Sequence, residues 1–221
     1  ERFAVMYSGN MSPIHPLDTL LTAALSLKTR EEIIFCFVGG GSEQAKVREF
    51  AAVHRLANLK CLPYQPLEQL SDSLSSADLH VVVMGEPFVG IIHPCKIYNV
   101  IEIGTHVLYI GPPTSHVTDL AHEFTARQFY SAANGDSTRV AEHILNALEC
   151  ADQSALSDSR ARRNSAESAD RSAHSKESLL PQLCSVLEPI DYSQQAAVGE
   201  AVLNYPDRAG IVKTPTPQGG N

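Results

Sequence analysis

Short apolar runs alternate along the chain with longer stretches in which apolar residues recur at helical spacing. The runs predict strands, and the spaced stretches predict amphipathic helices. Strands are expected at residues 3–8, 33–38, 59–62, 78–84, 106–110 and 125–130. Helices are expected at residues 16–27, 43–56, 67–75, 95–103, 116–123 and 137–148. This alternation predicts an α/β fold in which a parallel sheet carries helices on both faces.

The composition changes after residue 150, where Ser, Ala, Arg and acidic residues become frequent. Such a stretch resembles a linker, but Ala and Arg are good helix formers. We expect helices at residues 156–173 and 176–187, and a disordered tail rich in Thr, Pro and Gly. The chain therefore divides into an α/β domain at 1–150, C-terminal helices at 151–188 and a tail at 189–221.

The overall composition is that of an ordinary soluble domain, with 221 residues, 43% hydrophobic and 19% charged. This length allows one well-buried domain and hardly two. The formal net charge of −8 argues against a broad electrostatic grip on nucleic acid or anionic lipid. The expected partners are therefore small molecules or proteins, and one local basic pocket remains compatible with this charge.

The cysteines and the first residues bear on where the protein works. Five scattered cysteines, without any Cys-x-x-Cys pair, are typical of reduced thiols in a cytoplasmic protein and give no zinc signature. No apolar run is long enough to span a bilayer, and no signal peptide precedes the first strand. The chain begins without Met and almost directly on a strand, so we expect a piece of a longer cytoplasmic protein.

Four predicted loops follow the carboxyl ends of strands, the edge at which open parallel sheets bind ligands. They contain Gly9 and Asn10, then Gly39 and Gly40, then Pro63 and Tyr64, and finally Glu86 and Gly90. The glycines either let the backbone approach a phosphate or only permit sharp turns. The aromatic ring in the third loop is either a wall for a base or part of a solvated turn.

Lys96 stands at the N-terminus of a predicted helix, where the helix dipole disfavours a cation. Two interpretations stay open: an anion lies between the lysine and the helix amides, or the lysine extends into solvent. None of the nine histidines has metal-ligand spacing. His15 and His93 are stronger candidates for chemistry than the others because they lie in the loops just described.

Several short motifs occur in a specific order. They are YSGNM at 7–11, FVGGG at 37–41, LPYQP at 62–66, PCKIY at 94–98, IGPP at 110–113 and NGD at 134–136. This series resembles the C-terminal domain of family 4 (group 1) GT-B glycosyltransferases, and most closely those of the colanic-acid and capsule type. The resemblance implies a Rossmann-like domain that forms the donor-binding half of a two-domain enzyme.

The resemblance further implies retaining transfer of a sugar from a UDP- or GDP-sugar, without a metal ion or other cofactor. The product would be a bacterial polysaccharide or glycoconjugate. The acceptor would bind to an absent N-terminal domain, against which residues 151–188 would pack if they do not pack on this one. This chain alone would be inactive. Any contact with the inner face of the membrane would come through the absent domain.

By position in the motifs, the resemblance assigns Lys96 as the catalytic residue, which would stabilise charge on the leaving diphosphate. The implied donor-binding residues are Gly9, Asn10, Gly39, Gly40, Pro63, Tyr64, Glu86, Gly90, Lys96 and Asn99. Gly9 and Asn10 would line the phosphates, Pro63 and Tyr64 the base. Residues 86–90 would face the sugar. No metal ligand is implied.

Four positions depart from the family pattern. Residues 12–14 read Ser-Pro-Ile where relatives carry basic residues, and Asn99 replaces a glutamate that grips the ribose in many members. Cys95 replaces a serine, and His116 replaces a glutamate. Two other functions therefore stay open: a non-catalytic GT-B-like interaction module, and a sugar-nucleotide epimerase, which would need carboxylates that these loops do not obviously supply.

Overall fold

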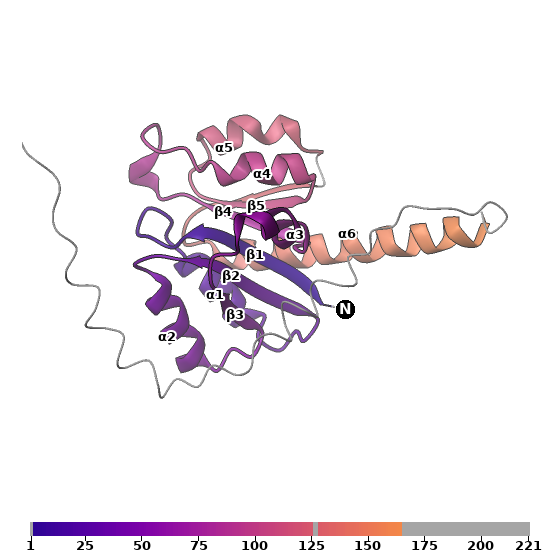
Figure 1. Cartoon of the computed structure of the whole chain (residues 1–221), viewed down its shortest axis with the longest axis horizontal. Coiled ribbons are helices and arrows are strands. Elements are labelled where there is room, and N and C mark those ends of the chain that lie inside the picture. Colours follow the sequence, from indigo (N-terminus) through magenta and orange to yellow (C-terminus); the bar gives the residue numbers. More distant parts are fainter. Residues whose placement is uncertain (1, 126–127, 165–221) are drawn as a thin grey trace, which may run out of the picture. The chain divides into compact units, whose positions relative to one another are not determined.

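The computed structural model describes residues 2–125 and 128–164, which contain one six-stranded sheet (Figure 1). Its strands are β1 (Phe3–Asn10), β2 (Ile33–Gly40), β3 (Leu59–Leu62), β4 (Leu79–Val83), β5 (His106–Ile110) and β6 (Phe129–Ala132). The strand order is β3-β2-β1-β4-β5-β6, and every neighbouring pair is parallel. The predicted Rossmann-like parallel sheet is confirmed.

The strand order reverses between β1 and β4. From β1 the chain moves outward to β2 and β3, and then returns to place β4 on the other side of β1. In open parallel sheets, ligands bind outside the carboxyl ends of the strands at such a switch point. The loops that leave β1 and β4 therefore border the position where a ligand is expected.

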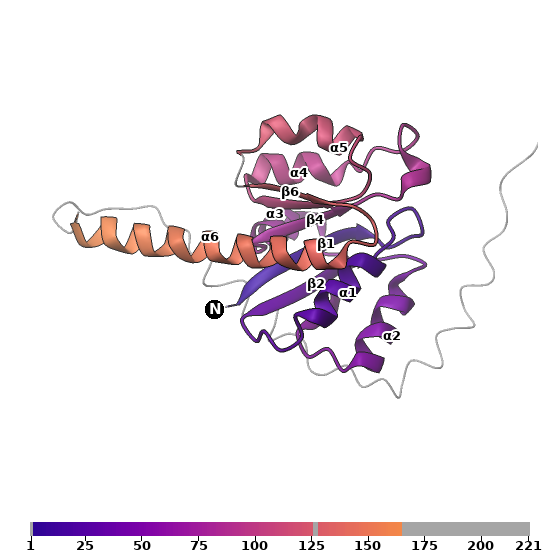
Figure 2. The same ribbon diagram turned by 180° about the vertical axis from the view of Figure 1, so that it is seen from behind.

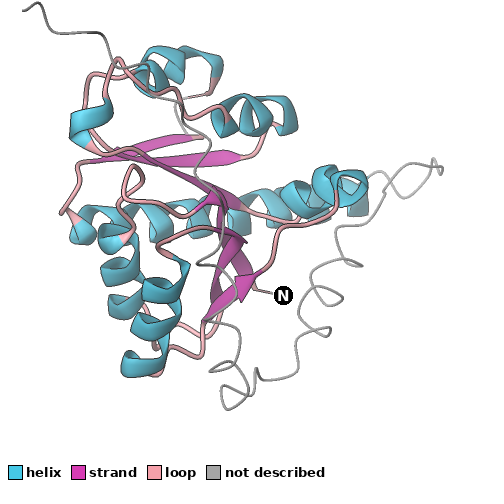
Figure 3. Ribbon diagram, turned by 60° about the vertical axis from the view of Figure 1, so that its left-hand side comes forward, coloured by secondary structure: helices cyan, strands magenta, loops and turns pink. Residues whose placement is uncertain are grey.

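Helices cover both faces of the sheet, as Figures 2 and 3 show. One face carries α1 (Asp18–Ser26), α2 (Gln44–His54) and α6 (Ser137–Asn164), and the other carries α3 (Leu70–Ser75), α4 (Lys96–Ile103) and α5 (His116–Asp119). Three short 3-10 turns complete the fold: η1 (Leu67–Gln69), η2 (Glu86–Phe88) and η3 (Leu120–Glu123). Because helices cover both faces, consecutive residues of β1 from Phe3 to Tyr7 are all buried.

Two of the predicted strands end later than expected. β1 and β2 continue to Asn10 and Gly40, and Gly9 pairs with Gly39 in the ladder between them. The predicted strand at 125–130 is wrong at its start, because β6 begins at Phe129. Gln128 instead closes a local turn, in which the Thr125 backbone N–H and hydroxyl both donate to its side-chain oxygen.

Helix α6 runs without interruption from Ser137 to Asn164, so the predicted end at 148 and new start at 156 are wrong. No Gly or Pro interrupts this stretch, and its Ala, Leu and Arg residues favour helix. Its first turns pack on α1 and the sheet through Val140, Ile144 and Ala147, and the helix then continues past the sheet (Figure 2). The predicted helices and tail beyond residue 164 lie outside the described residues.

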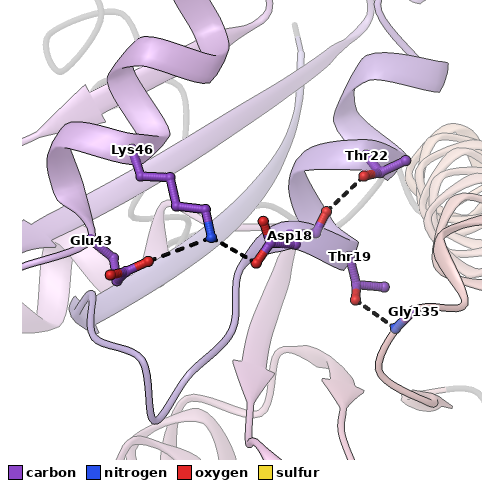
Figure 4. A network of polar contacts seen from close by, with 6 residues as sticks. All are labelled: Asp18, Thr19, Thr22, Glu43, Lys46 and Gly135. Carbon is purple, nitrogen blue, oxygen red and sulfur yellow. Dashed lines mark hydrogen bonds and ion pairs between the residues drawn. The ribbon is translucent and has the colours of Figure 1, made fainter.

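A polar network fixes the start of α1 (Figure 4). Lys46 Nζ lies 2.8 Å from Asp18 Oδ2 and 3.5 Å from Glu43 Oε2, which joins α2 to α1. The Gly135 N–H donates to Thr19 Oγ1 at 2.8 Å, which joins the turn before α6 to α1. The ion pairs are exposed and contribute at most about 1 kcal/mol each. Together these contacts hold the end of the loop that leads from β1 into α1.

Candidate functional site

Lys96 is the first residue of α4, directly after the loop that leaves β4 at the switch point. Its Nζ is buried and lies 3.7 Å from the centroid of the Tyr7 ring on β1. A Cβ atom added to Gly9 would lie 3.5 Å from the same nitrogen. The side chain therefore points across the strand ends onto β1, and the interpretation in which it extends into solvent is wrong.

The Lys96 ammonium has no counter-charge among the described residues. Nζ makes no hydrogen bond there, and burial lowers the pKa of Lys96 to about 7. The Tyr7 ring favours the charged amine by a cation–π contact. The pKa of Tyr7 is raised, first by burial and second by Tyr64, so this phenol stays neutral. Its O–H donates a hydrogen bond to Asn10 O at 2.8 Å. A buried cation without an anion is unfavourable, and a bound anion would supply the missing partner.

The glycines at this edge allow the backbone to pack closely. Gly39 has a φ of +129°, and a Cβ there would lie 2.2 Å from Gly9 O. Gly41 has a φ of +128°, and a Cβ there would lie 2.3 Å from Asn10 Oδ1. L side chains rarely adopt these φ values. Gly39 and Gly41 are therefore required by the backbone itself, and so is Gly9, whose φ is +134° and beside which the Lys96 side chain lies.

Tyr64 forms an exposed aromatic surface at the same edge. A Cβ added to Gly39 or Gly40 would lie 3.2 Å from its ring, so the ring rests on these two glycines. The side chain is still 61% exposed. Pro63 is also exposed, and its carbonyl accepts a hydrogen bond from the Gln65 side chain at 3.0 Å. An aromatic ring that is supported on one side and open on the other suits stacking with a planar base.

The remaining predicted site residues lie on the rim. Glu86 opens η2, Gly90 follows in the same loop with a φ of +77°, and Asn99 lies one helical turn after Lys96 on α4. All three are exposed, and no hydrogen bond or ion pair joins any of them to Lys96. The structure thus brings Lys96 together with the predicted residues of the first three loops, and leaves these three at the periphery.

Two residues close to Lys96 were not among the predicted binding residues. Tyr7 lies under the ammonium, and His15 lies in the loop after β1, where its Nδ1 donates to Val83 O at 2.7 Å. Burial and then the charge of Lys96 lower the pKa of His15. Its loop position was a signal in the sequence, whereas Tyr7 looked like any buried strand residue.

An aromatic cluster lies beside α4. Tyr98 Oη and His116 Nε2 are hydrogen-bonded at 2.6 Å, and the His93 ring stands edge-on to His116 with centroids 4.4 Å apart. The Tyr98 and His93 side chains are exposed, and His116 is half-buried. His116, which replaces a family glutamate, is therefore engaged with Tyr98 and His93 in this structure.

A cleft of about 870 Å³ lies at the opposite, amino edge of the sheet. It is lined by residues of both charges, among them Arg2, Arg30, Glu32, Asp78 and Asp152. None of the predicted site residues lines it. We place the candidate site at the carboxyl edge, because the switch point and the unpaired cation are both there.

Comparison with known proteins gives one relative and a group of similar folds. The putative colanic acid biosynthesis glycosyl transferase WcaI of Escherichia coli (strain K12) is 27% identical over 120 residues, 54% of this chain and 29% of the relative. Staphylococcus aureus TarM, in complex with UDP and other ligands, has a TM-score of 0.57 at 18% identity, covering 84% of this chain and 35% of TarM. Anabaena HepE, in complex with UDP and glucose, has a TM-score of 0.55 at 17% identity, and the match covers 67% of this chain and 39% of HepE.

The chain is thus similar in sequence to one putative colanic acid biosynthesis glycosyl transferase and similar in fold to the solved structures of TarM and HepE. No protein-family model matches it. The chain spans less than a third of the length of its colanic-acid relative. Residues 2–125 and 128–164 contain one Rossmann-like sheet with its helices. No helix in these residues has the length and apolarity to cross a membrane.

Proposed function

We propose that this chain is the nucleotide-sugar-binding part of a retaining glycosyltransferase that works in bacterial polysaccharide or glycoconjugate synthesis. The observation that carries the proposal is the buried Lys96 ammonium, which has no anionic partner and lies at the switch point of the sheet. The relation to a colanic acid glycosyl transferase supports the reaction class. The UDP complexes of TarM and HepE support the nucleotide class of the donor.

The chemistry follows from the charge that a donor would bring. A diphosphate would place anionic oxygens against Lys96 Nζ and the first amides of α4, which point toward the start of the helix. When the bond between the sugar and the diphosphate breaks, its electron pair stays on the diphosphate oxygen. Lys96 would stabilise this growing charge, and the acceptor hydroxyl would attack the anomeric carbon and pass its proton to the departing diphosphate oxygen.

The other residues of the edge have roles that fit this placement. The Tyr64 ring would stack on the base, with Pro63 beside it, and the backbone at Gly9 and Asn10 would border the phosphates. Glu86 and Gly90 now lie exposed in the loop after β4, and Asn99 lies exposed on α4. We expect these residues to reach the sugar and the ribose only when a bound ligand draws the loop and the start of α4 inward. We expect transfer to proceed without a metal ion.

The acceptor site belongs, in this proposal, to a second domain. The described residues form one Rossmann-like domain, and two-domain glycosyltransferases close such a domain on another across the donor. The isolated chain should therefore bind a donor without transferring its sugar.

Calorimetric titration of the 221-residue chain with UDP, GDP and the corresponding sugar nucleotides tests the proposal. We expect one nucleotide to bind, with Lys96→Ala weakening it about 100-fold because a charge-assisted bond is lost in a buried site. Lys28→Ala is the matched control, since Lys28 is exposed on the turn after α1 and should bind like wild type.

If none of these nucleotides binds, the result would contradict the proposal and favour a non-catalytic interaction module. Conversion of a sugar nucleotide into its epimer, without any acceptor, would instead favour the epimerase. Binding that Lys96→Ala leaves unchanged would show that the nucleotide lies elsewhere.

A further inference from the structure

The loop after β1 holds a second nitrogen base at the switch point. The His15 N–H donates to Ser12 O at 2.9 Å, and its ring Nδ1 donates to Val83 O at 2.7 Å. The Gly85 N–H donates to Ile14 O at 2.9 Å. The first bond lies within the loop, and the other two fasten the loop to the end of β4, the strand whose following loop leads to Lys96. The position of the His15 ring is thus fixed by the backbone of both loops.

The contact with Val83 also decides which nitrogen of His15 can change its charge. A carbonyl oxygen only accepts hydrogen bonds, so Nδ1 keeps its proton in both charge states. Nε2 is then bare in the neutral ring and takes the proton in the charged ring. Among residues 2–125 and 128–164, no hydrogen bond to Nε2 is formed, and the ring is only half-buried. Nε2 is therefore available to a ligand.

Lys96 acts on His15, and two other groups, His80 and Tyr7, are neighbours of Lys96; all of them are cationic or neutral. Lys96 approaches from α4, and its charge disfavours a second cation on His15. His80 on β4 is bonded through Nε2 to Leu74 O at 2.9 Å, and the phenol of Tyr7 on β1 stays neutral next to Tyr64. No carboxylate contributes to the pKa of His15 or of Lys96. The pair lacks an anion, and an arriving anion would favour a proton on both.

We propose that His15 is a second cationic contact for the donor diphosphate, and that its Nε2 takes a proton from solvent when the diphosphate binds. This inference rests on the proposed function and extends it. It assigns His15 the role of the basic residues that are missing at positions 12–14, from within the same loop. His15 acts here as a binding and positioning residue, and no covalent step is involved.

The test measures the pKa of His15 by NMR, from its ring Hε1 signal assigned through bonds, in the wild-type chain with and without saturating UDP-glucose. The diphosphate of this ligand keeps its charge across the titration. We expect the pKa of His15 to rise by at least one unit on binding. His15→Gln should lower the affinity for UDP-glucose about tenfold near pH 6.5 and leave the affinity for uridine unchanged.

His122→Gln is the control, because His122 is exposed and contacts only Asp119 and Glu123 in the described structure. An unchanged pKa of His15 under saturating UDP-glucose, or wild-type affinity in a folded His15→Gln, would overturn this inference while leaving the donor site at Lys96 intact. Absence of nucleotide binding by the wild-type chain would overturn the proposed function as well. The wild-type NMR titration decides the question even if the variant does not fold.

Discussion

Replacing Lys96 by methionine should stabilise the ligand-free protein. Methionine is unbranched and uncharged and ends one atom short of Nζ, in the buried space beside Tyr7. A pKa lowered from 10.5 to about 7 corresponds to about 5 kcal/mol of unfavourable free energy for the charged amine. Because the pKa of the amine reflects all its interactions, the contact with the Tyr7 ring included, the variant should gain up to about 5 kcal/mol in its free energy of unfolding near pH 7.

This gain should depend on pH in a defined direction. In the unfolded chain Lys96 holds its proton up to pH 10.5, whereas in the folded protein it loses the proton near pH 7. Between these values the unfolded state binds more protons, so raising the pH stabilises the wild-type fold. Below about pH 7 both states are protonated, and the full penalty applies. The advantage of Lys96→Met should shrink as the pH rises from about 7 to 9.

Urea unfolding followed by far-UV circular dichroism provides the measurement, since the chain contains no tryptophan. Lys28→Met serves as the control for a surface lysine and should change the free energy of unfolding by less than about 0.5 kcal/mol. The reasoning would be refuted if Lys96→Met were no more stable than wild type near pH 7. It would also be refuted if both proteins showed the same dependence of stability on pH.

Three further predictions concern the same edge of the sheet. Gly39→Ala should lose at least about 2 kcal/mol of stability in urea unfolding, because its Cβ would collide with Gly9 O. Gly90→Ala has open space around its Cβ and should lose about 1 kcal/mol, so equal losses in the two variants would contradict this prediction. Tyr64→Ala should weaken UDP binding in calorimetry but change stability by less than about 1 kcal/mol, and unchanged affinity would exclude stacking on its ring. Above about pH 7, the affinity of the wild-type chain for UDP-glucose should fall by a factor that approaches ten for each pH unit, whereas the affinity of Lys96→Arg should stay level. Identical pH profiles of affinity in the two proteins would contradict a titrating Lys96.

The fold could be predicted because each element carries its own pattern. The bounds of β3 and β5 match the predicted strands, since each is a short apolar run between turn residues. Helix α6 was misjudged around residue 150, where the Ser-rich composition suggested a break. No Gly or Pro enforces one, so helix propensity prevails.

The site was only partly predictable. Lys96 became a candidate because a cation at a helix N-terminus is unusual, and the family resemblance then assigned its role. Its contact with Tyr7 depends on how α4 lies over β1, which no local pattern specifies. The glycine at position 39 looked like part of a ligand cradle, yet its φ and its closeness to Gly9 O show a requirement of the backbone. His15 could be noticed by its loop, but its bond to Val83 depends on the tertiary structure.

In the proposed function, Lys96 receives the diphosphate of a nucleotide. The most direct measurement is the pKa of Lys96 by NMR of 13Cε-labelled lysine, in which six signals are expected and Lys96→Ala identifies the one of interest. We expect the pKa of Lys96 to be about 7 in the free protein and to rise by about two units or more under saturating UDP. A Lys96 that titrates near its ordinary value, or whose pKa ignores bound UDP, would contradict this expectation.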